Sequence, residues 1–211
     1  MTTTTDVVLV GGGVMSATLG VILRELDPSL HITLVERLDH VASESSDGWN
    51  NAGTGHAGYC ELNYTPGDQE GNVSIERALR INEAFEVSLQ LWSYLVKKRV
   101  LNPRDFINPT PHQSFVWSEE HVDFLKKRHE LMSAHPLFRD MDYTEDSRVL
   151  EDWMPLITDG RDPFQTVAAT RVRYGADVDF GSLTRSLVAY LQGKPNFELL
   201  LSHPMTALHQ N

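Results

Sequence analysis

The chain has 211 residues and an acidic balance, with 18 Lys and Arg against 29 Asp and Glu and a net charge of −11. Hydrophobic residues make up 41% of the chain, which excludes a protein disordered throughout and predicts one large or two modest domains. The charge argues against nucleic-acid binding, because neutralising phosphates requires clustered Lys and Arg. A single cysteine, Cys60, allows no intramolecular disulfide, which favours a reducing compartment.

An uncharged run covers residues 7–23 and has to be distinguished from a targeting segment. Gly11, Gly12 and Gly13 interrupt the run, and the residues before it include no basic side chain. A membrane-spanning helix rarely tolerates three successive glycines, and a signal peptide needs a basic leader. We therefore expect the chain in the cytoplasm or on the cytoplasmic face of the inner membrane.

The predicted elements open with a βαβ unit. The β-branched run 6–10 predicts a strand that is buried on both faces of a parallel sheet. Helical spacing of apolar residues follows over 14–26 and ends before Pro28, which disfavours helix at the preceding residue. A second strand is predicted over 31–35.

Further along, helical and strand-like segments alternate without an internal repeat. A loop rich in Ser, Asn and Gly over 41–58 precedes a long amphipathic helix over 74–100. A helix that breaks at Pro155 is predicted over 143–157, and the other helices over 118–132 and 180–192. Strands are predicted over 114–117, 166–174, 197–201 and 205–208. Ending at strand-like segments suggests a fragment or an unusually small domain.

The glycine turn after the first strand has the pattern of a dinucleotide-binding site. Gly11 permits a tight turn, Gly13 lets the backbone approach a pyrophosphate at the helix N-terminus, and the small Ser16 permits close packing of helix on strand. Glu36 follows 20 residues after Ser16 and can accept hydrogen bonds from a ribose hydroxyl. An acid here favours FAD or NAD over NADP. The alternative, a glycine turn that binds nothing, does not account for the strand, helix and acid together.

The loop over 43–58 helps to choose between these dinucleotides. Its many small and hydrogen-bonding residues suit an extended cofactor, and FAD explains such a loop better than NAD. The alternative is an ordinary Gly- and Asn-rich surface loop.

Several of these segments resemble the FAD-dependent malate:quinone oxidoreductases, within the wider class of D-amino-acid-oxidase-like flavoproteins. The matching segments are 10–20, 35–38, 48–56, 61–66, 112–117, 160–163, 167–171 and 175–181. Members of that family are more than twice as long, so the resemblance implies an N-terminal portion. The fold expected from it is α/β: a Rossmann-like FAD-binding domain over 1–60 and 170–211, with an inserted α+β substrate-side region over 61–169.

The resemblance also implies an activity and a set of cofactor-binding residues. Malate would transfer a hydride from C2 to flavin N5 and become oxaloacetate, and the electrons would pass to a membrane quinone. FAD would be held by residues of the glycine turn, the second strand, the following loop and the last segment: Gly11, Gly13, Ser16, Glu36, Arg37, Ser46, Asn50, Asn51, Gly53, Thr54 and Met205.

Malate carries two carboxylates, for which Arg and His are the natural partners. The candidates are His56, in the presumed flavin loop, and His112, Arg171 and Arg173. For the arginines the alternative is a solvated charge, and for His112 it is a packed loop histidine. The sequence assigns none of them as the catalytic base.

Metal and membrane sites receive less support. His129 begins a zinc-protease-like pattern, but Ser133 stands where the second His is needed, so no metal is expected. Basic clusters at 97–99 and 126–128 fit either an interfacial helix or cations near a helix C-terminus. Three alternatives to malate:quinone oxidoreductase activity remain: an FAD oxidase or dehydrogenase of another 2-hydroxy or amino acid, an inactive FAD-binding fragment, and an NAD dehydrogenase.

Overall fold

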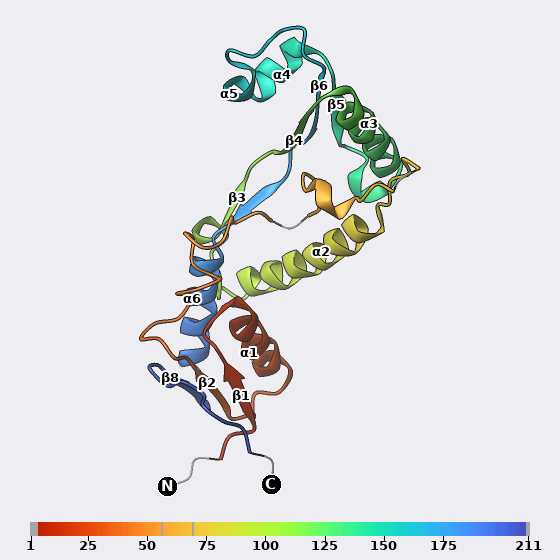
Figure 1. Ribbon diagram of the computed structural model, residues 1–211. Coiled ribbons are helices and arrows are strands. Elements are labelled where there is room, and N and C mark those ends of the chain that lie inside the picture. Colours follow the sequence, from red (N-terminus) through yellow and green to blue (C-terminus); the bar gives the residue numbers. More distant parts are fainter. Residues whose placement is uncertain (1–3, 56, 69, 210–211) are drawn as a thin grey trace. The chain divides into compact units, whose positions relative to one another are not determined.

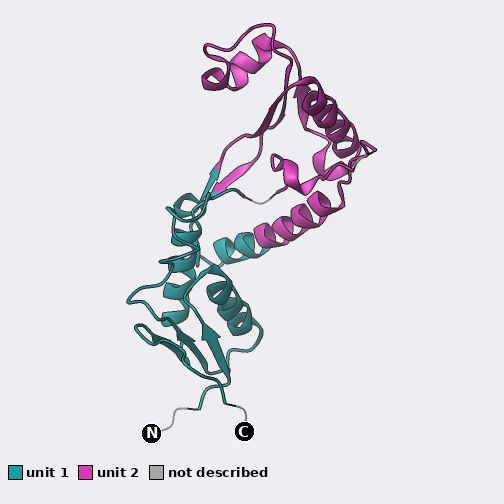
Figure 2. Ribbon diagram, viewed as in Figure 1, with its two compact units in different colours: residues 1–54, 91–108, 178–211 teal, residues 55–90, 109–177 magenta. Residues whose placement is uncertain are grey.

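A computed structural model describes residues 4–55, 57–68 and 70–209 (Figure 1). These residues form two compact units (Figure 2). Unit 1 comprises Met1–Thr54, Leu91–Asn108 and Val178–Asn211, and unit 2 comprises Gly55–Gln90 and Pro109–Asp177. The chain passes between the units at four places. The first is between Thr54 and Gly55, and the others lie inside the long helix α2 (Glu76–Lys97), inside β3 (Ile107–Pro109) and inside β7 (Ala176–Val178), where β3 and β7 are short strands that pair with each other.

Unit 1 is built on a parallel three-stranded sheet. Its order is β1 (Val7–Val10), β2 (Ile32–Val35) and β8 (Phe197–Leu200), and Leu34 is in register with Leu9 on one side and Leu199 on the other. Helices α1 (Val14–Leu26) and α6 (Phe180–Gln192) pack against each other. Gly20 makes this packing close, because a Cβ there would lie 3.0 Å from side-chain carbons of Leu191 and Leu9.

One face of β1 differs from the sequence prediction. Leu9 is buried beneath α1 and α6, but the side chains of Val8 and Val10, which point to the opposite face, are 52% and 51% exposed. Among the described residues of unit 1, no helix covers that face. The prediction of a strand buried on both faces is therefore wrong for this chain.

A carboxylate at the end of α1 ties three helices of unit 1 together. The Glu25 carboxylate accepts hydrogen bonds from the hydroxyls of Tyr94 and Tyr190, each at 2.5 Å, and from the Lys98 ammonium. Burial raises the pKa of Glu25, but the hydrogen bonds from Lys98, Tyr190 and Tyr94 outweigh it and lower that pKa to about 2. These contacts explain why residues 91–108 belong to unit 1, whereas the sequence prediction placed them in the inserted region.

Unit 2 is built on an antiparallel sheet with the order β4 (His112–Trp117), β6 (Val167–Val172) and β5 (Asp142–Thr144). Helix α3 (Glu119–Ser133) packs on one face, where a core forms from Val116, Val122, Leu125 and Ala168. The short helices α4 (Ser147–Trp153) and α5 (Pro155–Thr158) follow β5, and α4 contacts β6. Three single turns complete the described elements: η1 (Leu62–Tyr64), η2 (Pro103–Asp105, in unit 1) and η3 (Pro136–Phe138).

The strand register sorts the side chains of unit 2 onto two faces. Successive residues of a strand point to opposite faces, so directly paired residues share one. Gln113, Arg171 and Asp142 stand in one cross-strand row, and Phe115 and Ala169 lie on the same face. The opposite face, toward α3, carries Val116 and Ala168.

The predicted α/β fold is confirmed, including the helix over 14–26, and two segments differ. No strand forms over 205–208, because the described chain offers it no neighbouring strand with which to form a ladder. The predicted helix over 143–157 begins instead with β5 and then divides at Met154, since Pro155 starts a new helix rather than continuing the old one. Among the described helices, none is long and apolar enough to cross a bilayer.

Candidate functional site

The glycine turn of unit 1 is held between the first two strands. Gly11 has a φ of +92°, a conformation that favours glycine, and Gly13 is the N-cap of α1. A Cβ at Gly12 would lie 2.8 Å from a methyl carbon of Val41 and 3.1 Å from Glu36 Oε2. The carbonyl of Gly12 accepts the amide hydrogen of Ala42 at 2.9 Å. The turn therefore has no room for a side chain at its centre.

Glu36 ties the turn to the end of β2. Its Oε2 accepts the Gly12 amide at 2.6 Å, and its Oε1 accepts the Leu38 amide at 2.8 Å. A carboxylate oxygen can accept more than one hydrogen bond, so both oxygens keep capacity for a ligand hydroxyl. The acid predicted to bind a ribose thus also positions the backbone that would meet a pyrophosphate.

The loop after β2 returns to the N-terminus of α1. Ser46 is 2% exposed, and its hydroxyl accepts the Val14 amide at 3.0 Å. Asn50 and Asn51 donate from their side-chain amides to the carbonyls of Glu44 and Ser45, at 3.2 and 3.0 Å. The loop is therefore braced by its own side chains, in the manner of a preformed binding loop.

Two cavities adjoin the glycine turn. The first, of about 150 Å³, is lined by residues of the turn and the loop: Gly11, Gly12, Gly13, Glu36, Leu38, Ala42, Ser43, Glu44, Ser45 and Ser46. The second, of about 340 Å³, is lined by Val10, Gly11, Val35, Glu36, Arg37, Glu44, His203, Pro204 and Met205. Both cavities share Gly11, Glu36 and Glu44.

The structure gathers about half of the residues predicted to bind the cofactor around these cavities. They are Gly11, Gly13, Glu36, Arg37, Ser46 and Met205. Ser16, Asn50, Asn51, Gly53 and Thr54 line neither cavity. The carbonyl of Gly53 accepts the Val178 amide, and the Gly53 amide donates to Asn51, so this part of the loop joins β7. His203 was not predicted; it joins the site because its amide donates to the Glu36 carbonyl at 2.8 Å.

Three of the four residues predicted to bind carboxylates are described; they lie in unit 2 and do not form one cluster. His56 lies outside the described residues. His112 is 6% exposed, its Nε2 lies 3.0 Å from the carbonyl of Ala176, and its ring packs edge-on against Tyr59. This placement supports the alternative of a packed histidine. Because it is adjacent in sequence to Gln113, His112 points to the face of the sheet opposite that of Arg171.

Arg171 and Arg173 differ in their partners. Arg173 is exposed, and its Nε donates to Asp142 Oδ2 at 3.3 Å. The Arg171 guanidinium lies 5.5 Å from the centre of the Trp153 ring. No carboxylate in the described part of the chain forms an ion pair with Arg171, so of these two arginines Arg171 is the one with capacity for an anionic ligand.

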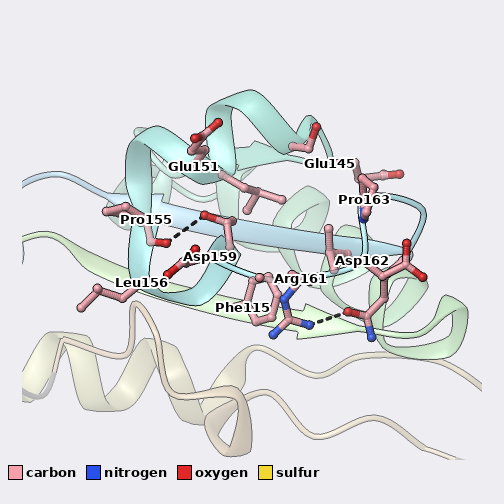
Figure 3. Close-up of a pocket in the computed structure, with 15 residues that line it drawn as sticks. Phe115, Glu145, Glu151, Pro155, Leu156, Asp159, Arg161, Asp162 and Pro163 are labelled. Carbon is pink, nitrogen blue, oxygen red and sulfur yellow. Dashed lines mark hydrogen bonds between the residues drawn. The ribbon is translucent and has the colours of Figure 1, made fainter.

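A third cavity, of about 740 Å³, lies in unit 2 between the sheet face and the segment 145–165 (Figure 3). The Arg161 guanidinium lies 4.8 Å from the centre of the Phe115 ring and donates to Gln165 Oε1 at 2.5 Å. Four acids also line the cavity, at 145, 151, 159 and 162. Sequence reasoning singled out 160–163 only within the resemblance, because nothing in its pattern shows that it folds back over β4.

Comparison with known proteins decides the family. The sequence profile described as "Malate:quinone oxidoreductase (Mqo)" matches residues 3–211. The chain belongs to the malate:quinone oxidoreductase family.

Relatives within this family are similar over nearly the whole chain. A probable malate:quinone oxidoreductase of Hahella chejuensis is 66% identical over 206 residues, which cover 97% of this chain and 41% of that protein. One from Methylobacillus flagellatus is 65% identical over 207 residues, covering 98% of this chain and 42% of that protein. The chain therefore spans about two fifths of the length of these malate:quinone oxidoreductases.

Solved structures confirm the fold predicted for this malate:quinone oxidoreductase family member. L-α-glycerophosphate oxidase of Mycoplasma pneumoniae, determined with FAD bound, has a TM-score of 0.66 and 18% identity, over 95% of this chain and 45% of that one. Glycine oxidase of Geobacillus kaustophilus has the same score and identity, over 94% and 46%. At this identity the likeness extends to the fold.

The basic clusters considered for membrane contact are partly engaged elsewhere. Arg128 is fully buried and donates to Thr65 Oγ1 and to the carbonyl of Tyr59. Lys98 bonds Glu25, and Lys127 donates to the carbonyl of Gly71. Part of each cluster therefore has a structural partner, whereas Lys97, Arg99 and Lys126 are exposed. Among the described residues, no group of three or more His, Cys, Asp or Glu side chains is placed to hold a metal ion.

Proposed function

We propose that the protein is an FAD-dependent malate:quinone oxidoreductase that oxidises (S)-malate to oxaloacetate and passes the electrons to a membrane quinone. The proposal is carried by one observation above the others: within a chain of this family, Glu36 holds the Gly11–Gly13 turn at the N-terminus of α1. FAD supplies the redox chemistry when bound, as acceptor of the hydride from C2 of malate and donor to the quinone.

The residues of unit 1 fit FAD in charge and in shape. The first amides of α1 have no partner inside the helix, and the helix dipole places partial positive charge there, which favours a pyrophosphate. The cavity of about 150 Å³ adjoins this helix end, and its lining includes the backbone of three glycines as well as Glu36 and Glu44. At the glycines the backbone can approach a phosphate closely. Ser46 fixes the first turn of the helix from the other side.

The cavity of about 340 Å³ in unit 1 suits the adenosine portion of FAD. Glu36 offers carboxylate oxygens to ribose hydroxyls, and an acid there disfavours a 2′-phosphate. Arg37 and Met205 line the same cavity. Arg37 is paired with Glu44, which also lines both cavities. Asn50, Asn51, Gly53 and Thr54 are proposed to hold the remainder of the cofactor through the braced loop, and Ser16 to keep α1 close to β1.

Malate and quinone place different demands on the chain. A dicarboxylate needs cationic hydrogen-bond donors, and Arg171 supplies a guanidinium without an acidic partner in the described residues. A membrane quinone requires peripheral contact with the membrane, so we propose that the protein works at the cytoplasmic face of the inner membrane. FAD oxidation of another 2-hydroxy or amino acid is the alternative tested alongside it.

The experiment is anaerobic reduction of the FAD-loaded protein by a panel of substrates, followed by reoxidation with a soluble quinone. The proposal predicts flavin bleaching with (S)-malate, a slower or absent response to glycine, L-proline and glycerol phosphate, and recovery of the bands with quinone. Bleaching by an amino acid in preference to malate would support the alternative. NADH formation from malate would contradict both.

A further inference from the structure

The cross-strand row Gln113–Arg171–Asp142 in unit 2 contains two polar atoms without partners. Arg171 Nε and Gln113 Oε1 are both buried, and neither has a hydrogen-bond partner within the described residues. The two side chains lie on directly paired positions of β6 and β4, so they point from the same face of the sheet. Buried polar groups are nearly always paired, and leaving them unpaired is costly. An unpaired donor and an unpaired acceptor on directly paired strand positions therefore point to a ligand.

The third member of the row does not neutralise Arg171. The Asp142 carboxylate is engaged by Arg173, whose Nε lies 3.3 Å from Oδ2. Arg171 forms no ion pair with any described residue, and its guanidinium instead lies against the Trp153 ring. The acid of the row is thus paired with Arg173 and not with Arg171, which leaves the Arg171 guanidinium available to an external carboxylate.

We propose that Arg171 and Gln113 form a recognition site for a 2-hydroxycarboxylate, in which Arg171 binds the carboxylate and the Gln113 side-chain oxygen accepts the hydroxyl hydrogen. A 2-hydroxy acid carries an acceptor and a donor on neighbouring carbons, which matches a donor and an acceptor on neighbouring strands. The assignment rests on the proposed function, for which it names the residues that separate malate from a dicarboxylate lacking the hydroxyl.

Trp153 is the side chain expected to respond to the ligand. Because Arg171 Nε and Gln113 Oε1 are shielded from solvent, a ligand reaches them only when a covering side chain moves, and the Trp153 ring lies over the guanidinium. Trp153 ends the short helix α4, and the residue after it departs from helical conformation. Its indole N–H signal is therefore a local reporter of binding.

The test is titration of the 211-residue chain with (S)-malate and with succinate, followed by NMR of the Arg Nε–H and Trp indole N–H signals. Wild type is expected to bind malate about fivefold more tightly than succinate, the value of one neutral hydrogen bond. Gln113→Leu should remove this preference and keep succinate binding. Arg171→Met should weaken both ligands about tenfold or more. Arg80→Gln, which removes an exposed charge on α2, should change neither.

Three results would overturn the assignment: equal affinity of wild type for malate and succinate, retention of the malate preference in Gln113→Leu, or unchanged affinity in Arg171→Met. These failures differ from failure of the proposed function, which is read from flavin reduction. If malate bleaches the flavin of wild type and Arg171→Met equally, the oxidoreductase proposal stands and this assignment falls. If malate binds with the expected preference over succinate but does not bleach the flavin, this assignment stands and the oxidoreductase proposal falls.

Discussion

Replacing Glu36 by Gln should weaken both the fold of unit 1 and its cofactor site. The carboxylate accepts the amides of Gly12 and Leu38 at 2.6 and 2.8 Å, so each bond is made to a charged acceptor. Hydrogen bonds to charged groups contribute about 1.5–3 kcal/mol each. Glutamine keeps one carbonyl oxygen for one amide and turns an NH₂ group toward the other. We expect a loss of about 2–4 kcal/mol in the free energy of unfolding.

The assay is urea unfolding of the 211-residue chain without FAD, followed by FAD titration monitored through flavin fluorescence. The variant should also bind FAD about ten- to a hundredfold more weakly, because it loses an anionic acceptor for a ribose hydroxyl. Glu44→Gln is the matched control: Glu44 lines the same two cavities but forms an exposed pair with Arg37, which contributes less than about 1 kcal/mol. Equal effects of the two variants, or no effect of Glu36→Gln, would refute the role assigned to Glu36.

Three further predictions concern the rest of the chain. Because the folded pKa of Glu25, about 2, lies below its ordinary value of 4.5, its stabilisation is complete above about pH 5 and is lost as the pH falls toward 2. Allowing for solvent screening, urea unfolding should show about 1–2 kcal/mol of acid-dependent loss that Glu25→Gln lacks. Burial, and then Glu61, raises the pKa of the Cys60 thiol to about 12, so Cys60 should resist iodoacetamide at pH 7.5 until urea unfolds the chain; rapid native labelling would contradict this. Gly175→Ala should cost about 2–3 kcal/mol in thermal unfolding, because the added Cβ would lie 2.3 Å from His112 Cδ2, whereas Gly48→Ala, where nothing lies within 4 Å, should cost far less.

The prediction of the glycine turn rests mostly on residues close together in the sequence. Gly11, Gly13 and Glu36 could be assigned because the strand, the helix start and the acid follow one another at fixed spacing, and each has a local physical cause. The structure adds that Glu36 accepts the Gly12 amide and that the Ser46 hydroxyl accepts the Val14 amide, contacts across 24 and 32 positions that no periodicity reveals.

Other features depend on the register and on distant packing. Arg171 could be selected from the sequence for its chemistry, but its cross-strand alignment with Gln113 follows from the antiparallel register of two residues that lie 58 positions apart in the sequence. The strand predicted over 205–208 does not form, because residues that favour β structure form a strand only beside a partner strand. Residues 91–108 belong to unit 1 through Glu25, which the helical pattern of α2 does not indicate.

We propose above that these residues hold FAD at the Gly11–Gly13 turn for the oxidation of malate. The most direct test is the visible absorption spectrum of the purified protein supplied with FAD, recorded before and after anaerobic addition of (S)-malate. We expect bound-flavin bands that survive removal of free FAD, bleach with malate, and are lost in Glu36→Gln. A protein that retains no flavin, or a bound flavin that malate leaves oxidised, would contradict it.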